Sequence, residues 1–192
     1  MGIVDRLKFY FASLRVWKYK LLSDCKATEG TPRLYHPLLL KGKGKIVFGN
    51  DVQIGVVNSP NYFSHYTYVE ARNSASQIII GNNVAINNGF SMVAMKKIVI
   101  EDNVLIGVNC YITDTDSHHL DPLRRNEANP PVKEVHIMKN VFLGSNVIVL
   151  KGVTIGENSV IGNSSVVTKD IPPNVIAAGN PARVIKPLAL KH

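Results

Sequence analysis

Residues 135–170 read VHIMKN VFLGSN VIVLKG VTIGEN SVIGNS SVVTKD, six successive hexads. The third position of every hexad is aliphatic, and the first is Val or Ser. A six-residue period fits neither a helix nor a long amphipathic strand, but it fits short strands joined by tight turns, each pointing one aliphatic residue inward. We therefore predict a parallel β-helix, in which stacked rungs form the continuous core that no single rung can bury alone.

The first and third positions of the hexad form two series of residues, called the two tracks below. Both tracks recur upstream, and residues 46–54 form an early copy. The upstream members are Ile78, Ile80, Val84, Ile86, Phe90, Met92, Ile98, Ile100, Val104, Ile106, Cys110 and Ile112. Gly and Asn follow many of them, as in Gly81-Asn82-Asn83, Asp102-Asn103 and Gly156-Glu157-Asn158. These residue types suit corners that need left-handed backbone angles.

Composition is that of a soluble globular protein: 192 residues, 45% hydrophobic and 19% charged, enough for one domain with an appendage. Cys25 and Cys110 show no CxxC or Cys/His spacing, which favours a reducing compartment over a zinc or redox site. Basic residues interrupt every hydrophobic stretch of the N-terminus, so neither secretion nor a membrane span is expected. A formal charge of +8 favours an anionic partner.

Residues 3 to 22 have a different period, with apolar side chains spaced by four and three. The members of this stripe are Ile3, Leu7, Tyr10, Leu14, Trp17 and Leu21. Such spacing predicts an amphipathic helix. The helix would pack on the β-helix or on a neighbouring subunit; alternatively, a basic amphipathic helix would rest on an anionic membrane.

The repeat is interrupted by residues 113 to 134, TDTDSHHLDPLRRNEANPPVKE, which lie between the rung ending at Ile112 and the rung resuming at Val135. A loop of this length inside a compact domain is usually functional or disordered. It carries two histidines, several aspartates and an Arg pair, a dense polar set leaving a rigid scaffold.

The repeats resemble those of the hexapeptide-repeat acyltransferases, and the match covers residues 46 to 185. The resemblance implies an all-β, left-handed parallel β-helix with a short N-terminal helix. It also implies a homotrimer with active sites between subunits, and acetyl-CoA as co-substrate with no metal. The expected division is a helical appendage over 1–30, the acyltransferase domain with its loop over 31–185, and a C-terminal tail over 186–192.

Acyl transfer from a thioester to an alcohol or amine needs a base for the acceptor's proton and donors for the developing oxyanion. Histidine suits the first task, and a nearby carboxylate can fix its tautomer. The residues alone do not separate His118 from His119. In the maltose, galactoside and capsular-polysaccharide O-acetyltransferases, a His followed by two residues and Asp-Pro carries the base, which here is His118. Asp116 or Asp114 would orient its ring.

The resemblance also matches Asn87 to the family's active-site asparagine, with Asn88 as the alternative register. Cys110 lies on the inward track, so we expect a core residue, and direct transfer in a ternary complex rather than through an acyl-enzyme. Relatives commonly have Trp where this chain has Phe142, which keeps the aromatic face but lacks the N–H donor.

Positions matching the family's acetyl-CoA site lie in the C-terminal rungs, where rung backbone would hold the pantetheine arm and basic side chains the phosphates. They are Gly144, Ser145, Asn163, Thr168, Lys169 and Arg183. Lys169 and Arg183 are the natural phosphate partners; the alternative is that both are solvated surface charges.

Residues 58 to 73, NSPNYFSHYTYVEARN, place aromatic rings beside charged hydrogen-bonding groups, which suits a sugar ring. Several of these residues would equally serve as packing of an imperfect rung, and His65 is expected to be structural or substrate-contacting rather than catalytic. The candidate acceptor residues are Tyr66, Tyr68 and Arg72 in this segment, with Asp121 and Arg125 in the 113–134 loop.

The sequence thus predicts a cytoplasmic acetyl-CoA-dependent O-acetyltransferase acting on a polysaccharide unit or small saccharide, with contact at the inner face of the membrane as an option. An N-acetyltransferase of a nucleotide-linked amino sugar and a xenobiotic acetyltransferase differ only in the acceptor, and a larger acyl donor such as succinyl-CoA stays open. A non-catalytic scaffold like the gamma-class carbonic anhydrases is less favoured, because the spaced metal-binding histidines of that class are missing from this sequence.

Overall fold

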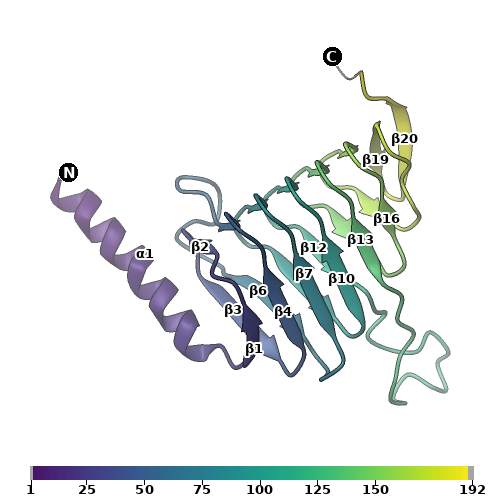
Figure 1. Ribbon diagram of the computed structural model, residues 1–192, viewed down its shortest axis with the longest axis horizontal. Helices are drawn as coiled ribbons and strands as arrows, with labels where there is room; N and C mark the ends of the chain where they lie inside the picture. The colour runs from purple at the N-terminus through teal and green to yellow at the C-terminus, as the bar shows by residue number, and fades with distance from the viewer. Residues whose placement is uncertain (1, 190–192) are drawn as a thin grey trace.

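The computed structural model describes residues 2–189, and it is a left-handed parallel β-helix with one N-terminal helix (Figure 1). Three parallel sheets form the faces of the solenoid, and each coil contributes one strand to each sheet. Sheet A consists of β1 (Ala27–Glu29), β4 (Lys45–Phe48), β7 (Gln77–Ile80), β10 (Lys97–Ile100), β13 (Val135–Ile137) and β16 (Thr154–Ile155). The fold class expected from the hexads is confirmed.

Sheets B and C complete the triangular section. Sheet B consists of β2 (Arg33–Leu34), β5 (Gln53–Ile54), β8 (Ala85–Ile86), β11 (Leu105–Ile106), β14 (Phe142–Leu143), β17 (Val160–Ile161), β19 (Val175–Gly179) and β20 (Ala182–Pro187). Sheet C consists of β3 (Leu38–Gly42), β6 (Thr67–Ala71), β9 (Ser91–Ala94), β12 (Tyr111–Thr113), β15 (Ile148–Val149) and β18 (Val166–Val167). The last pair, β19 and β20, is antiparallel and closes the C-terminal end.

Both tracks of the hexad point into the solenoid. Every aliphatic member from Ile137 to Val167 is 0% exposed, and Ser159 and Ser165 are equally buried. Strand pairing stacks equivalent track positions, for example Ile137 on Ile155 and Leu143 on Ile161. Stacked aliphatic residues therefore make a continuous core along the axis. This burial stabilises strands that are only two residues long.

The corners carry the expected left-handed residues. Asn83, Asn103 and Asn158 have φ values of 54°, 60° and 62°. Asn tolerates this conformation better than most non-glycine residues, and its amide can bond along the corner, as Asn158 does by donating to Asn174 Oδ1 at 2.7 Å. Corners of this kind turn the chain from one sheet to the next without a long connection.

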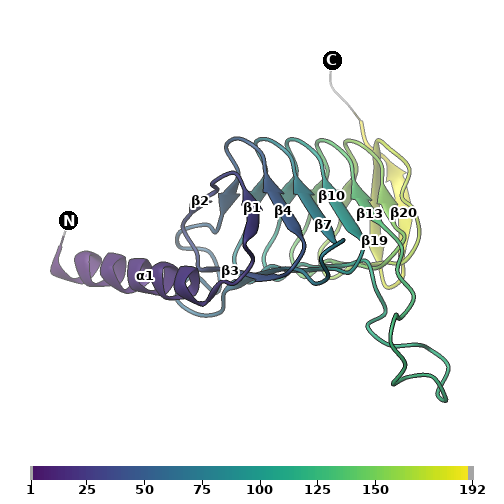
Figure 2. The ribbon, with the colours of Figure 1, turned by 60° about the horizontal axis from the view of Figure 1, so that its bottom comes forward.

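Two segments leave the solenoid at different corners (Figure 2). Residues 55–66 join β5 to β6 at the edge between sheets B and C, the B–C edge, and residues 114–134 join β12 to β13 at the C–A edge. The second segment, called the arm below, protrudes from the solenoid and is closed at its base by an antiparallel bridge between Thr115 and Val132. The interruption predicted at 113–134 is thus an excursion of one corner.

Helix α1 (Ile3–Leu22) has the predicted bounds and extends beyond the first coil. Of the described residues 2–189, no helix is long and apolar enough to span a bilayer. The solenoid begins at β1, inside the segment expected to be a helical appendage (1–30), and a first coil of β1, β2 and β3 precedes the recognised repeat at residue 46. Strand β20 extends into the expected tail, of which residues 190–192 lie outside the described part.

Candidate active site

His118 lies on the exposed arm, and a backbone carbonyl fixes its ring. Its Nδ1 is 3.0 Å from the carbonyl oxygen of Arg125. A carbonyl oxygen only accepts hydrogen bonds, so Nδ1 carries the proton in this contact, and in the neutral ring Nε2 has the free lone pair. The arm therefore presents Nε2 of His118 as the basic nitrogen.

His119 is held differently, since its Nε2 is 3.2 Å from the carbonyl oxygen of Ala128. By the same reasoning its Nε2 is the protonated nitrogen, and the ring is half-buried while that of His118 is exposed. The two histidines, which the residues alone do not separate, thus have opposite tautomers.

Neither expected aspartate is the group that holds His118. Asp116 Oδ2 pairs with Lys151 Nζ at 2.9 Å. Asp114 is fully buried and accepts three backbone N–H groups, those of Met95, Lys96 and Lys97, at 2.7 to 2.8 Å. Asp114 thereby fixes the turn between β9 and β10, and the group that contacts the His118 ring is the carbonyl of Arg125.

Asn87 and Asn88 follow β8 at the B–C edge and differ in freedom. Asn88 is 0% exposed, and its amide accepts from the backbone N of Val56 and donates to the carbonyls of Val56 and Pro60. Asn87 is half-buried, and its side chain makes only a local bond, in which Oδ1 accepts from the backbone N of Asn88 at 2.8 Å. The amide nitrogen of Asn87 is the one left to contact a ligand.

Most expected acetyl-CoA residues lie on this same edge, one coil after another. Gly144 and Ser145 follow β14, Asn163 follows β17, and Asn163 Oδ1 accepts from the backbone N of Ser145 at 2.9 Å. Arg183 pairs with Ala178 in the closing hairpin, and Ala178 is the residue that lies next to Gly162. The B–C edge is therefore a ridge of backbone groups ending in an exposed cation.

Thr168 and Lys169 are exceptions, because they follow β18 at the C–A edge, the edge from which the arm leaves. Sheet C separates the two edges. Its strand β9 has four residues, which corresponds to about 13 Å. One protomer therefore places Asn87 and His118 at opposite sides of sheet C, and does not bring them together.

The expected acceptor residues Tyr66 and Tyr68 lie near the B–C edge that also carries Asn87. A cavity of about 410 Å³ is lined by His65, Tyr66, Tyr68, Gly89 and Ser91, and Gly89 comes two residues after Asn87. The cavity combines aromatic rings with a serine hydroxyl and an imidazole. These are the groups that pack on and hydrogen-bond to a sugar.

A charged network stiffens the outer face of β6. Arg72 donates from Nε and Nη2 to Glu70 at 3.0 and 2.9 Å, and the Tyr68 hydroxyl donates to Glu70 Oε2 at 3.0 Å. Burial and Glu70 raise the pKa of Tyr68 to about 12, and the hydrogen bond from Arg72 lowers the pKa of Glu70. Arg72 is thus bound to Glu70, so its role in acceptor binding stays a prediction.

Asp121 and Arg125 lie exposed on the arm, where Asp121 Oδ1 accepts from the backbone N of Leu123. Two apolar side chains near the tip, Leu120 and Leu123, are 74% and 93% exposed. Exposed leucines on a protruding loop favour contact with another surface.

Cys110 is a core residue, as expected. It is 1% exposed, its Sγ lies 3.0 Å from the carbonyl oxygen of Gly144, and burial raises the pKa of its thiol to about 11. A thiol of this kind is a poor nucleophile. Phe142 is 44% exposed on the outer face of sheet B, next to Leu105 and two residues before Gly144 of the ridge.

Two side chains that hold the segment 55–66 could not be found from the sequence. Arg15 of α1 donates to the carbonyls of Tyr62, Ser64 and His65, and the buried ring of His36 bonds through Nε2 to the carbonyls of Asn61 and Ser64. Backbone carbonyls are the partners in both cases. Since every residue has a carbonyl, no residue-type signal could have revealed these contacts.

Two family models match the chain within the solenoid. The bacterial transferase hexapeptide model (six repeats) matches residues 134–169, and the hexapeptide repeat of succinyl-transferase matches residues 97–113. The chain is therefore a hexapeptide-repeat protein, and its resemblance to the hexapeptide-repeat acyltransferases is confirmed.

Particular relatives are acetyltransferases. The chain is 43% identical to galactoside O-acetyltransferase of Escherichia coli (strain K12) over 130 residues, which are 68% of this chain and 59% of that protein. The chain spans about three fifths of the length of the first curated relatives that it matches.

Solved structures agree with these matches. A galactoside acetyltransferase in complex with coenzyme A superposes with a TM-score of 0.57 at 36% identity, over 75% of this chain and 65% of that one. The polySia-specific acetyltransferase NeuO superposes with a TM-score of 0.65 at 25% identity, over 86% and 84%. A hexapeptide-repeat acetyltransferase of Vibrio cholerae complexed with acetyl-coenzyme A gives 0.57 at 25% identity, over 97% and 85%.

Proposed function

We propose that this protein is an acetyl-CoA-dependent O-acetyltransferase that acetylates a hydroxyl of a carbohydrate, with His118 as the general base. The observation that carries the proposal is the tautomer of His118: the arm holds Nδ1 against a carbonyl and leaves Nε2 exposed and basic. The relatives named as galactoside O-acetyltransferases support the choice of a sugar hydroxyl.

In the proposed reaction, Nε2 of His118 takes the proton of the acceptor hydroxyl as its oxygen attacks the thioester carbonyl carbon. The carbonyl of Arg125 accepts from Nδ1–H and stabilises the imidazolium that forms. The amide N–H of Asn87 donates to the oxyanion. When the tetrahedral intermediate collapses, the C–S bond breaks, and the imidazolium returns its proton to the coenzyme A sulfur.

The proposed donor site fits the residues present. Along the B–C ridge Asn163 is exposed, Ser145 is half-buried and Gly144 is buried, so Ser145 and Asn163 are the positions that suit the amides of a pantetheine arm. Lys169 and Arg183 supply exposed cations for the phosphates. No metal is part of the proposal. Among residues 2–189, no three His, Cys, Asp or Glu side chains come together as metal ligands.

A homotrimer completes the proposed site. Asn87 and the acceptor cavity lie at the B–C edge, whereas His118, Thr168 and Lys169 lie at the C–A edge. Packing the B–C edge of one protomer against the C–A edge of the next brings the base and the oxyanion donor into one cleft. Such a head-to-tail contact closes into a ring. Surface polysaccharide synthesis in the cytoplasm is the setting we propose for this activity.

The test is release of free thiol from acetyl-CoA in the presence of a panel of acceptors. His118→Ala should lower the rate by about 10²- to 10⁴-fold. His119→Ala is the matched control, and it should stay within about tenfold of the native protein because its protonated Nε2 is bound to a carbonyl. Equal rates for His118→Ala and the native protein would show that the base is misassigned. Turnover of nucleotide-linked amino sugars alone would replace the O-acetyltransferase by an N-acetyltransferase.

A further inference from the structure

The apolar stripe of α1 faces away from the solenoid. Its members are Ile3, Leu7, Tyr10, Leu14, Trp17 and Leu21, which are 58% to 79% exposed. At 100° per residue these six occupy an arc of about 80°, and Ala12, the one buried residue of the helix, lies about 180° from the centre of that arc. The pattern is amphipathic as predicted, but the solenoid does not cover the apolar side.

Specific contacts on the Ala12 side prevent the helix from rolling. Arg15 donates to the carbonyls of Tyr62 and Ser64 at 2.7 Å, and the ring of Tyr19 stacks on Tyr66 at 4.6 Å between centroids. Turning the stripe toward the solenoid would break these contacts and leave the guanidinium without its carbonyl partners. The stripe is therefore held outward in the protomer.

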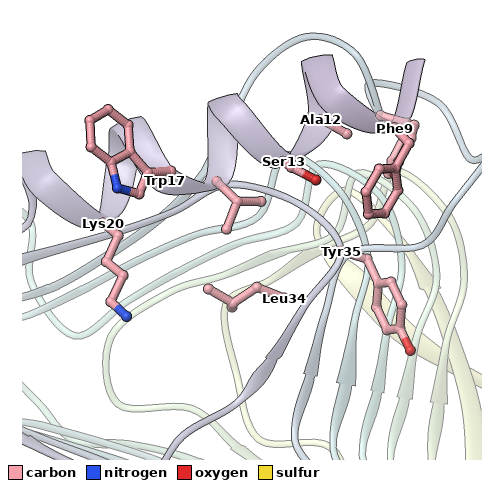
Figure 3. A pocket seen from close by; sticks show the side chains of 9 residues that line it. Phe9, Ala12, Ser13, Trp17, Lys20, Leu34 and Tyr35 are labelled. Carbon is pink, nitrogen blue, oxygen red and sulfur yellow. The ribbon is translucent and has the colours of Figure 1, made fainter. Parts of the chain in front are cut away.

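Apolar packing under α1 is thin. A cavity of about 310 Å³ lies between the helix and the first coil (Figure 3). Phe9, Lys20 and, at the edge of the stripe, Trp17 line it from the helix, and Leu34 and Tyr35 line it from the first coil. Most of the large apolar side chains of the helix are thus not used for folding of the protomer. Six large apolar side chains on one face of a helix, each more than half exposed, mark an interaction surface.

Charge indicates what covers the stripe. The helix has five basic residues and one acidic residue, Asp5. Arg6 and Lys18 border the stripe, each about 20° beyond one of its edges on the helical wheel. A second copy of the same helix would meet like charges along both borders, whereas an anionic lipid surface complements them.

We propose that α1 binds the surface of an anionic lipid bilayer and lies in its plane, with the stripe among the upper acyl segments and Arg6 and Lys18 at the phosphates. Trp17 and Tyr10 sit on the stripe as amphipathic rings suited to the headgroup boundary. Because Arg15 and Tyr19 bind the segment 55–66, docking of the helix holds that end of the solenoid at the bilayer. This inference does not depend on the proposed activity.

The experiment is flotation of the full chain with vesicles of pure phosphatidylcholine and of phosphatidylcholine with 30 mol% phosphatidylglycerol, a fraction of roughly the anionic content that attracts basic segments. The native protein should float with the anionic vesicles and at least about tenfold less with neutral ones. The double variant Leu7→Ser and Leu14→Ser should lose at least about tenfold in partitioning, since two buried leucines are removed from the lipid.

Two controls make the outcome decisive. Arg6→Gln with Lys18→Gln should weaken anionic binding more than Lys26→Gln with Lys43→Gln, which removes the same charge from exposed positions outside the helix. Equal loss in both pairs, or vesicle binding unaffected by the serine variant, would overturn the proposal. Light scattering of the serine variant is the remaining readout: a change of oligomeric state would assign the stripe to a second copy instead. Thiol release with a soluble acceptor should stay unchanged in every variant.

Discussion

Replacing Asn88 and Asn87 one at a time separates a structural side chain from a functional one at adjacent positions. The buried Asn88 amide makes three short hydrogen bonds to residues 56–60, at 2.9 to 3.1 Å, and a longer one at 3.4 Å. Asn87 makes one local bond, at 2.8 Å. The two substitutions to alanine remove the same atoms but very different numbers of partners.

The magnitudes follow from these partners. At about 1 kcal/mol for each short hydrogen bond, Asn88→Ala should lower the free energy of unfolding by about 3 kcal/mol. For a chain of this size that is a fall in Tm of about 6 to 12 °C. Asn87→Ala should cost about 1 kcal/mol, or about 2 to 4 °C. In the proposed reaction it also removes an oxyanion donor, so thiol release should fall by about 10²- to 10³-fold.

Thermal melting by circular dichroism and thiol release at 25 °C, measured on the same preparations, check both effects. Asn88→Ala should raise KM for the acceptor more than it lowers kcat, because the segment that it anchors leads into the acceptor cavity. Equal falls in Tm for the two variants would refute the reading of the hydrogen bonds. Near-native turnover by Asn87→Ala would refute its role in the reaction.

Asp114→Ala should lower the free energy of unfolding by about 3 kcal/mol in urea, because three buried backbone N–H groups lose their acceptor; a loss under about 1 kcal/mol would contradict this. Asp116→Asn should keep kcat within about threefold, since a carbonyl and not this carboxylate contacts His118, the proposed base; a hundredfold fall would return the orienting role to Asp116. Burial lowers the pKa of His36, so the unfolded chain binds more protons and stability should fall as pH drops below about 6.5; His36→Gln should flatten that part of the stability curve, and equal slopes would argue against the assignment. Cys110→Ala should keep its activity, whereas an inactive variant of native Tm would revive a covalent route.

The solenoid was predictable because every coil buries its residues in the same way. Each hexad must place an aliphatic residue inside the solenoid, so the six-residue period occurs many times in the sequence. Residues such as Ile137 and Ile155 stack as expected. The repeat was recognised only from residue 46, because β1 reads ATE and β2 reads RL, without the hexad. Of the first coil, β2 and β3 lie inside the expected domain 31–185 and β1 lies before it. A terminal coil is covered by solenoid on one side only, so its sequence is less constrained.

The sequence proposes residues for the candidate site, which stay predictions, but it does not predict how they are arranged. An interruption of a strict repeat locates the arm, and polar residue types point to its two histidines. The resemblance to the O-acetyltransferases selects His118 over His119. The group that orients the ring is a backbone carbonyl, which has no signature in residue type. Residue types also do not show that Asn87 and His118 lie at different edges of the solenoid. The edge on which a residue lies follows from the order of the strands around the coil.

For the helix α1, too, the sequence predicts the element but not its contacts. Its spacing correctly predicts one apolar face over residues 3–22, but a periodic pattern states only that such a face exists, and not what covers it. Here the solenoid side is chosen by Arg15 and Tyr19, through polar and stacking contacts, and by the small residue Ala12. Contacts of that kind fix the orientation of the helix without using its outward apolar stripe. The larger apolar face is thereby left for a second interaction, and two cations at its borders make an anionic surface the better match for it.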